Sequence, residues 1–217
     1  MTNEQIIEKA IDEITSPTFG TTEQCLKIHK IVLKKGKPQV ARIDLESKDN
    51  TAIVYFPVEE EKFNFAVYVN LEKQEVSGFG TEPYNKVYFR TYSEKFSVNE
   101  LKSMTKLIPT EGWNIGDLRK HIPGKYAFSS IEFMPNPEPD EFDDKLTKLL
   151  DFLEQDREGI KKLIENASGY IQVVMIFYNG NGCLGGPAIN KENIRRMSEL
   201  GLDIDFDLYA FGNNFID

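Results

Sequence analysis

Three aspartates near the carboxyl end of the chain alternate with apolar residues. Ile204 and Phe206 separate Asp203, Asp205 and Asp207. Alternate side chains of a β-strand point to one face and each residue rises about 3.3 Å, so these carboxylates would lie roughly 7 Å apart on one face. Such a row offers oxygen ligands to Mg²⁺ or Ca²⁺, or contacts to a basic partner; the alternative is a solvated strand face. Because carboxylates on one strand rarely encircle an ion unless a loop adds ligands, we assign no metal site.

A glycine-dense segment, residues 179–186, precedes the last helix of the pattern. Glycine lets backbone amides approach a phosphate closely, so Asn179, Asn181 and Gly182 are candidate ligand contacts. The segment lacks both the Gly-Lys-Ser/Thr ending of a P-loop and the Gly-x-Gly-x-x-Gly spacing of a dinucleotide fold. Asn-Gly pairs are also typical of hairpin turns, so a turn or bulge is the alternative.

Two further features are candidate contacts for a protein partner. Trp113 is the only tryptophan and lies in a segment expected to be a loop, where an exposed indole would anchor an interface. Burial of this side chain as a core residue is the alternative. Glu59, Glu60 and Glu61 form an acidic turn, which is either solvated or meets a basic partner.

No set of residues in the sequence matches a catalytic pattern. His29 and His121 are the only histidines and lie in different halves of the chain, and no serine has a Gly-x-Ser-x-Gly context. Cys25 and Cys183 lie far apart and are expected to be free thiols in a reducing cytosol. We therefore assign no catalytic residue and no cofactor.

Charge and hydropathy restrict the partners. The formal net charge of −9 over 217 residues repels phosphate backbones, so we expect no nucleic-acid binding and favour a basic protein partner. No apolar run approaches the roughly 18 residues of a membrane span, and the amino terminus does not resemble a secretory signal. We expect a cytoplasmic protein with no membrane contact.

Hydrophobic periodicity divides the chain into two parts. In residues 1–85, isoleucines at helical spacing predict a helix over residues 2–14, and a β-meander follows from Cys25 to Phe79. The Pro- and Gly-containing segment Gly80–Asn85 is expected to be a linker between two domains.

In residues 86–217, strands and helices alternate. Ser97 and Glu100 form a capping-box pattern that starts a helix. The other expected elements are strands at 87–92, 126–133, 170–178 and 202–209, a long helical region around 146–164 that Gly159 would bend or split, and a helix at 190–200. These patterns predict an α+β fold of two small domains, 1–85 and 86–217, each a mainly antiparallel or mixed sheet with helices packed on one face. The last strand is expected to be half exposed, at a sheet edge.

The second part resembles a known family. The strand Val87–Tyr92, the loop Ile108–Asp117 with Trp113, and the helix that leads into residues 201–209 are similar to a bacterial family called domain of unknown function 4279. The resemblance covers about residues 87–211 and leaves 1–85 unassigned. It implies a small cytoplasmic bacterial protein with an α+β fold and brings no catalytic residues. Families of this kind often include immunity proteins that neutralise a toxin, which is an analogy at family level.

These observations favour a non-enzymatic protein-binding module, most concretely an immunity protein that blocks a basic toxin. Its contacts would be the aspartates 203, 205 and 207, Trp113 and the Glu59–Glu61 turn. The alternative is a small-molecule or divalent-metal-dependent enzyme with its site between the 179–186 loop and the aspartate strand. A third hypothesis is a self-assembling module that pairs through an exposed sheet edge.

Overall fold

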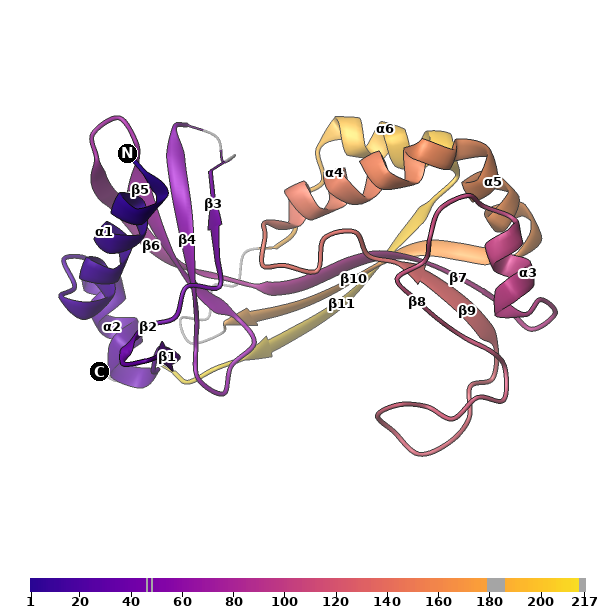
Figure 1. Cartoon of the computed structure of the whole chain (residues 1–217), viewed down its shortest axis with the longest axis horizontal. Helices are drawn as coiled ribbons and strands as arrows, with labels where there is room; N and C mark the ends of the chain where they lie inside the picture. The colour runs from indigo at the N-terminus through magenta and orange to yellow at the C-terminus, as the bar shows by residue number, and fades with distance from the viewer. Residues whose placement is uncertain (46, 48, 179–185, 215–217) are drawn as a thin grey trace.

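The computed structural model describes residues 1–45, 47, 49–178 and 186–214. The chain forms two lobes along its longest axis, an N-terminal lobe (residues 1–82) and a C-terminal lobe (residues 84–211) (Figure 1). One lobe contains an antiparallel sheet and the other a mixed sheet, each with helices, which confirms the predicted α+β class. Within the described ranges, no helix has the length and apolar character needed to cross a bilayer.

The N-terminal lobe is a four-stranded antiparallel sheet in the order β3-β4-β5-β6, covered by two helices. Its elements are α1 (Asn3–Thr15), α2 (Gly20–Ile28), β1 (Leu33–Lys34), β2 (Lys37–Pro38), β3 (Arg42–Asp44), β4 (Thr51–Pro57), β5 (Asn64–Asn70) and β6 (Glu75–Glu82). Helix α1 begins with a capping box, in which Thr2 and Gln5 exchange side-chain and backbone hydrogen bonds. Its buried residues Ile6, Ala10 and Ile14 pack on the sheet, as their helical spacing predicts.

Two predictions for this lobe are wrong. The chain is helical over α2, where a β-signal was expected from Cys25 onward, because Thr22 and Cys25 lie one turn apart and are both buried. The expected linker at residues 80–85 is strand on both sides of Pro83. Gly80 pairs with Ala66 in the first sheet, and Asn85 pairs with Met175 in the second. The division into domains 1–85 and 86–217 stays a prediction.

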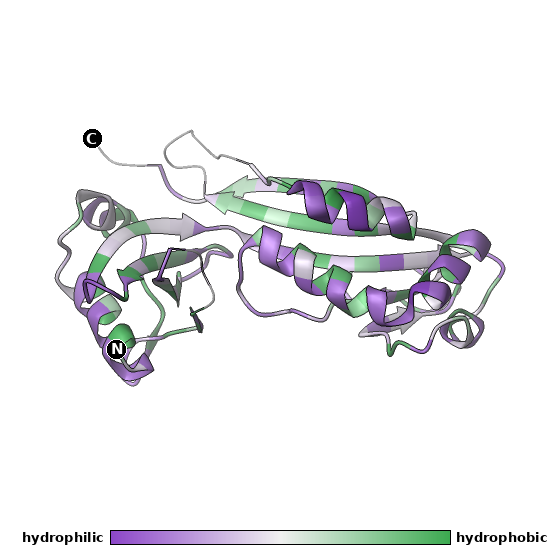
Figure 2. Ribbon diagram, turned by 90° about the horizontal axis from the view of Figure 1, so that it is seen from above, coloured by the Kyte–Doolittle hydropathy of each residue, from purple (hydrophilic) through white to green (hydrophobic). Residues whose placement is uncertain are grey.

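The C-terminal lobe is a five-stranded sheet in the order β11-β10-β7-β9-β8. Its elements are β7 (Tyr84–Ser93), α3 (Val98–Ser103), β8 (Glu111–Trp113), β9 (Ser129–Phe133), α4 (Phe142–Leu153), α5 (Arg157–Asn166), β10 (Ser168–Tyr178), α6 (Lys191–Leu200) and β11 (Asp203–Phe211). Helices α4, α5 and α6 lie on one side of the sheet (Figure 1), and hydrophilic residues occupy their outward surfaces (Figure 2). Their inward residues form the core with alternate residues of β7 and β10.

Strand β11 lies at the edge of this sheet, as predicted. It pairs in parallel with β10, and helix α6 makes the crossover between the two strands. Ile204 and Phe206 pack against the helix-covered core. The three aspartates alternate with these residues and therefore point to the face that carries no helix.

Other features of this lobe differ from the predictions. Trp113 belongs to β8, not to a loop, because it pairs with Ser130 in the ladder. Strand β9 begins at Ser129, not at 126. The long helical region breaks at Glu154–Asp156, not at Gly159, because the Asp156 side chain caps α5 by accepting the Gly159 N–H at 3.2 Å.

Tyr178, the last residue of β10, joins the two lobes. Its ring is buried in the core of the N-terminal lobe, with centroids 5.1 Å from those of both His29 and Phe63. Its hydroxyl donates to the Asn213 carbonyl at 2.9 Å, and the Asn213 amide side chain donates to the Ile28 carbonyl at 2.9 Å. The chain that leaves β11 is therefore bonded to the N-terminal lobe.

A substitution at Gly212 tests this junction. Gly212 has φ +112°, and an added Cβ would lie 2.5 Å from the Tyr178 ring and 3.2 Å from Phe63. We expect Gly212→Ala to lower the free energy of unfolding by about 1–3 kcal/mol, through backbone strain and steric overlap. Urea unfolding measures this. Gly20→Ala, where a Cβ meets open space, is the control; equal stabilities of the two variants would contradict the account.

Candidate functional site

The face of the five-stranded sheet opposite helices α4–α6 gathers charged and aromatic side chains. We call it the open face. The ladder aligns its residues in rows across β7, β10 and β11. These rows are Arg90–Tyr170–Asp203, Tyr88–Gln172–Asp205, Lys86–Val174–Asp207 and Tyr84–Ile176–Tyr209. Acidic residues thus follow the edge strand, and basic residues follow β7, two strands or about 10 Å away.

Arg90 is fixed by its neighbours on the open face. Its Nε and Nη2 atoms lie 2.7 and 2.5 Å from Oε1 of Glu132, which neutralises its charge. Its Nη2 also donates to the Tyr88 hydroxyl at 3.1 Å, and its guanidinium carbon lies 5.6 Å from the Trp113 ring centroid. Burial raises the pKa of Tyr88 to about 12 although Arg90 opposes this, so the phenol stays neutral.

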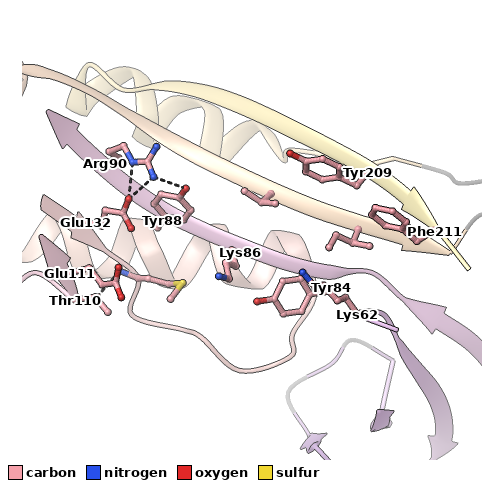
Figure 3. Close-up of a pocket in the computed structure, with 13 residues that line it drawn as sticks. Lys62, Tyr84, Lys86, Tyr88, Arg90, Thr110, Glu111, Glu132, Tyr209 and Phe211 are labelled. Atoms are coloured by element: carbon pink, nitrogen blue, oxygen red, sulfur yellow. Dashed lines mark hydrogen bonds and ion pairs between the residues drawn. The ribbon is translucent and has the colours of Figure 1, made fainter. Parts of the chain in front are cut away.

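A hollow of about 540 Å³ runs along the open face, from Arg90 and Glu132 at one end to Lys62 of the N-terminal lobe at the other (Figure 3). Lys86 and Tyr84 come from β7, and Lys62 comes from the turn before β5 of the other lobe. Tyr209 and Phe211 of β11 line the hollow as well. Both lobes therefore contribute to this site.

The structure brings some of the predicted residues together. Asp203, Asp205 and Asp207 are exposed on one face of β11. Trp113 lies on the same face, on the opposite edge strand β8. The indole is half-buried and stacked on Tyr126, with ring centroids 4.5 Å apart, so it is more enclosed than a free surface anchor would be.

The acidic turn lies apart from these residues. Glu59, Glu60 and Glu61 follow β4 in the N-terminal lobe, and a carboxylate oxygen of Glu61 lies 3.8 Å from Nε2 of His29. Glu60 and Glu61 line a smaller hollow that shares Lys62, Ile176 and Phe211 with the larger one. The predicted ligand contacts Asn179, Asn181 and Gly182 lie outside the described residues.

An acidic cluster at the lobe junction was not predicted from the sequence. Among the described residues, three or more potential metal ligands come within 4.8 Å of one another only at Asp44, Asp140 and Asp144, so the aspartate row of β11 does not converge on a common point. Asp140 is buried and is already bound by Lys148 at 2.8 Å and by Arg42 at 3.1 Å. The positive charges of Lys148 and Arg42 balance the carboxylate charge that a bound metal ion would otherwise balance. The contact from Arg42 also ties β3 to the segment before α4.

Comparison with protein families shows which family the C-terminal lobe matches. Residues 82–211 match the family described as Domain of unknown function (DUF4279). The chain therefore belongs to this family, which confirms the resemblance seen in the sequence and extends its start by five residues. The matched region contains all five strands of the open face. Neither the curated proteins nor the solved structures gave a match.

The lobe junction predicts a pH dependence of stability. Glu82 ends β6, where burial, with Glu141 and Asp140 adding to it, raises its pKa to about 8. A carboxyl whose pKa is raised from 4.5 stabilises the fold fully below pH 4.5, and this contribution is lost as the pH rises to 8. Burial lowers the pKa of nearby Lys145 to about 8, so this lysine is charged in both states below that pH.

We expect the free energy of unfolding of the wild type, measured against that of Glu82→Gln, to fall between pH 5 and 8. The slope approaches at most about 1.4 kcal/mol per pH unit. Urea unfolding at several pH values measures it. Glu75→Gln, an exposed change on the same strand, should keep the wild-type slope. Parallel curves for the wild type and Glu82→Gln would show that Glu82 does not carry the effect.

Proposed function

We propose that this protein is a non-enzymatic binding module that docks a basic protein partner on edge strand β11. The observation that carries the proposal is a nine-residue edge strand with three exposed aspartates on one face. Among the described residues, β11 pairs with β10 alone. An edge strand presents unpaired backbone N–H and C=O groups, and a partner strand that adds there gains main-chain hydrogen bonds.

The aspartates determine which kind of partner strand can pair with the free edge of β11. In a strand laid beside β11, every second side chain lies next to the aspartate row on the open face. Lysine or arginine at those positions would pair with Asp203, Asp205 and Asp207. A second copy of β11 would instead place aspartates near aspartates, which is destabilising. The row therefore favours a basic strand from another protein over self-pairing.

Aromatic residues continue the same face of β11 beyond the aspartates. Tyr209 is 48% exposed and Phe211 is 52% exposed. Exposed aromatic side chains beside a charged rim are typical anchors of protein interfaces. The net charge of −9 would also speed the encounter with a basic partner. Within this proposal, the specific form that we favour is an immunity protein that covers and blocks a basic toxin.

The test is capture of the partner by variants of matched charge. Tagged wild type, the triple variant Asp203→Asn/Asp205→Asn/Asp207→Asn and the control Glu4→Gln/Glu8→Gln/Asp12→Asn are compared in lysate of the native source. The control removes three exposed carboxylates from α1, away from the open face. We expect wild type and control to retain one salt-sensitive partner, with affinity at least tenfold lower in the β11 variant. Equal capture by both triple variants, or no salt-sensitive partner in any arm, would contradict the docking site.

The immunity form has a separate readout. Expression of the captured partner alone should stop growth, and co-expression of the wild-type chain should restore it. The β11 triple variant should restore growth less than the α1 control does. A captured partner that is harmless alone would remove the immunity form and leave the binding module standing.

A further inference from the structure

The hollow where the lobes meet differs in charge from the rest of this acidic chain. We propose that it binds a small amphiphilic anion, with a carboxylate, sulfonate or phosphate group held by Lys62 and Lys86 and an apolar, preferably aromatic body against the walls. The site is distinct from the aspartate row and does not depend on the proposed protein partner. It adds a small-molecule ligand to a chain in which the aspartate row and the Glu59–Glu61 turn are acidic.

The size and walls of the hollow suit a small molecule. Its volume of about 540 Å³ falls within the roughly 300–1,000 Å³ of ligand pockets. Val174, Ile176 and Met134 supply apolar surface. Tyr84 lies between Lys86 and Lys62, with Tyr209 and Phe211 on the β11 side (Figure 3). An aromatic body can stack on such rings while its charged group stays within reach of the lysines.

The charges that line the hollow do not cancel. Its carboxylates are Glu132, which binds Arg90 at 2.5 Å, and Glu111, which lies 3.4 Å from Lys120 outside the hollow. Lys62 and Lys86 have neither an ion pair nor a side-chain hydrogen bond within the described part of the chain. Two ammonium groups thus remain for a ligand, and unlike Arg90 they require no existing ion pair to break.

The two lysines come from different lobes. Lys86 stands on β7, and Lys62 stands on the turn before β5. They share one hollow because Tyr178 is buried against Phe63, the residue next to Lys62. An anion between them would therefore contact both lobes at once.

The test uses the fluorescent aromatic sulfonate 1-anilinonaphthalene-8-sulfonate. It is titrated into the full chain, into Lys62→Gln/Lys86→Gln, and into the control Lys73→Gln/Lys161→Gln, which removes two exposed lysines elsewhere. We expect one saturable site in wild type and control, and at least tenfold weaker binding in the first double variant. Non-saturable binding, or equal affinity of both double variants, would overturn the proposal.

Displacement of the dye then tests the ligand class. Indole-3-acetate carries a carboxylate on an aromatic body, and inorganic phosphate carries charge alone. We expect indole-3-acetate to displace the dye at concentrations at least tenfold lower than phosphate at equal ionic strength. Equal displacement by phosphate would mean that the walls add nothing, and the amphiphilic assignment would fail.

Discussion

The burial of Tyr178 in the N-terminal lobe is the interaction on which the rest of the structure depends. The strand that carries it belongs to the C-terminal sheet, yet its ring packs beside His29 and Phe63. Asn213 bonds the Tyr178 hydroxyl and so holds the chain end after β11 against the same lobe. On the other side of the junction, the partly buried Arg42 pairs with the buried Asp140 and fixes β3. Asp140 is itself buried and is bound by both Arg42 and Lys148, so this cluster and the Tyr178 contacts resist separation of the lobes.

Helices cover one face of the five-stranded sheet, so both candidate sites lie on the other face. Helices α4–α6 bury one alternation of residues, and the opposite alternation presents acidic side chains on β11 and basic side chains on β7, with aromatic residues on both strands. The acidic residues of β11 lie at an edge where a strand can add. The basic residues of β7 line a hollow that suits a small anion. Tyr209 and Phe211 border both, so one face offers two neighbouring sites of opposite charge.

Local signals in the sequence predicted most of the elements, but not α2 or β8, and long-range contacts determined where the candidate sites form. The period-two pattern of residues 203–209 predicted a strand with its aspartates on one face, and the Ser97–Glu100 capping box predicted the start of α3. The alternation of Tyr84, Lys86, Tyr88 and Arg90 is visible in the sequence, but only the packing of α4–α6 reveals that this face is open. Nothing local places Lys62 beside Lys86, since they belong to different lobes. The same holds for Asp44 and Asp140, which meet only at the lobe junction.

The docking of a basic strand on β11 is the central claim, and amide hydrogen exchange tests it most directly. Exchange is followed in the free chain and in its complex with the captured partner. We predict slower exchange in β11 on binding, because its free edge gains main-chain hydrogen bonds, and unchanged exchange in the four-stranded sheet β3–β6. Protection confined to helices α4–α6 or to β3–β6, with β11 unchanged, would contradict the account.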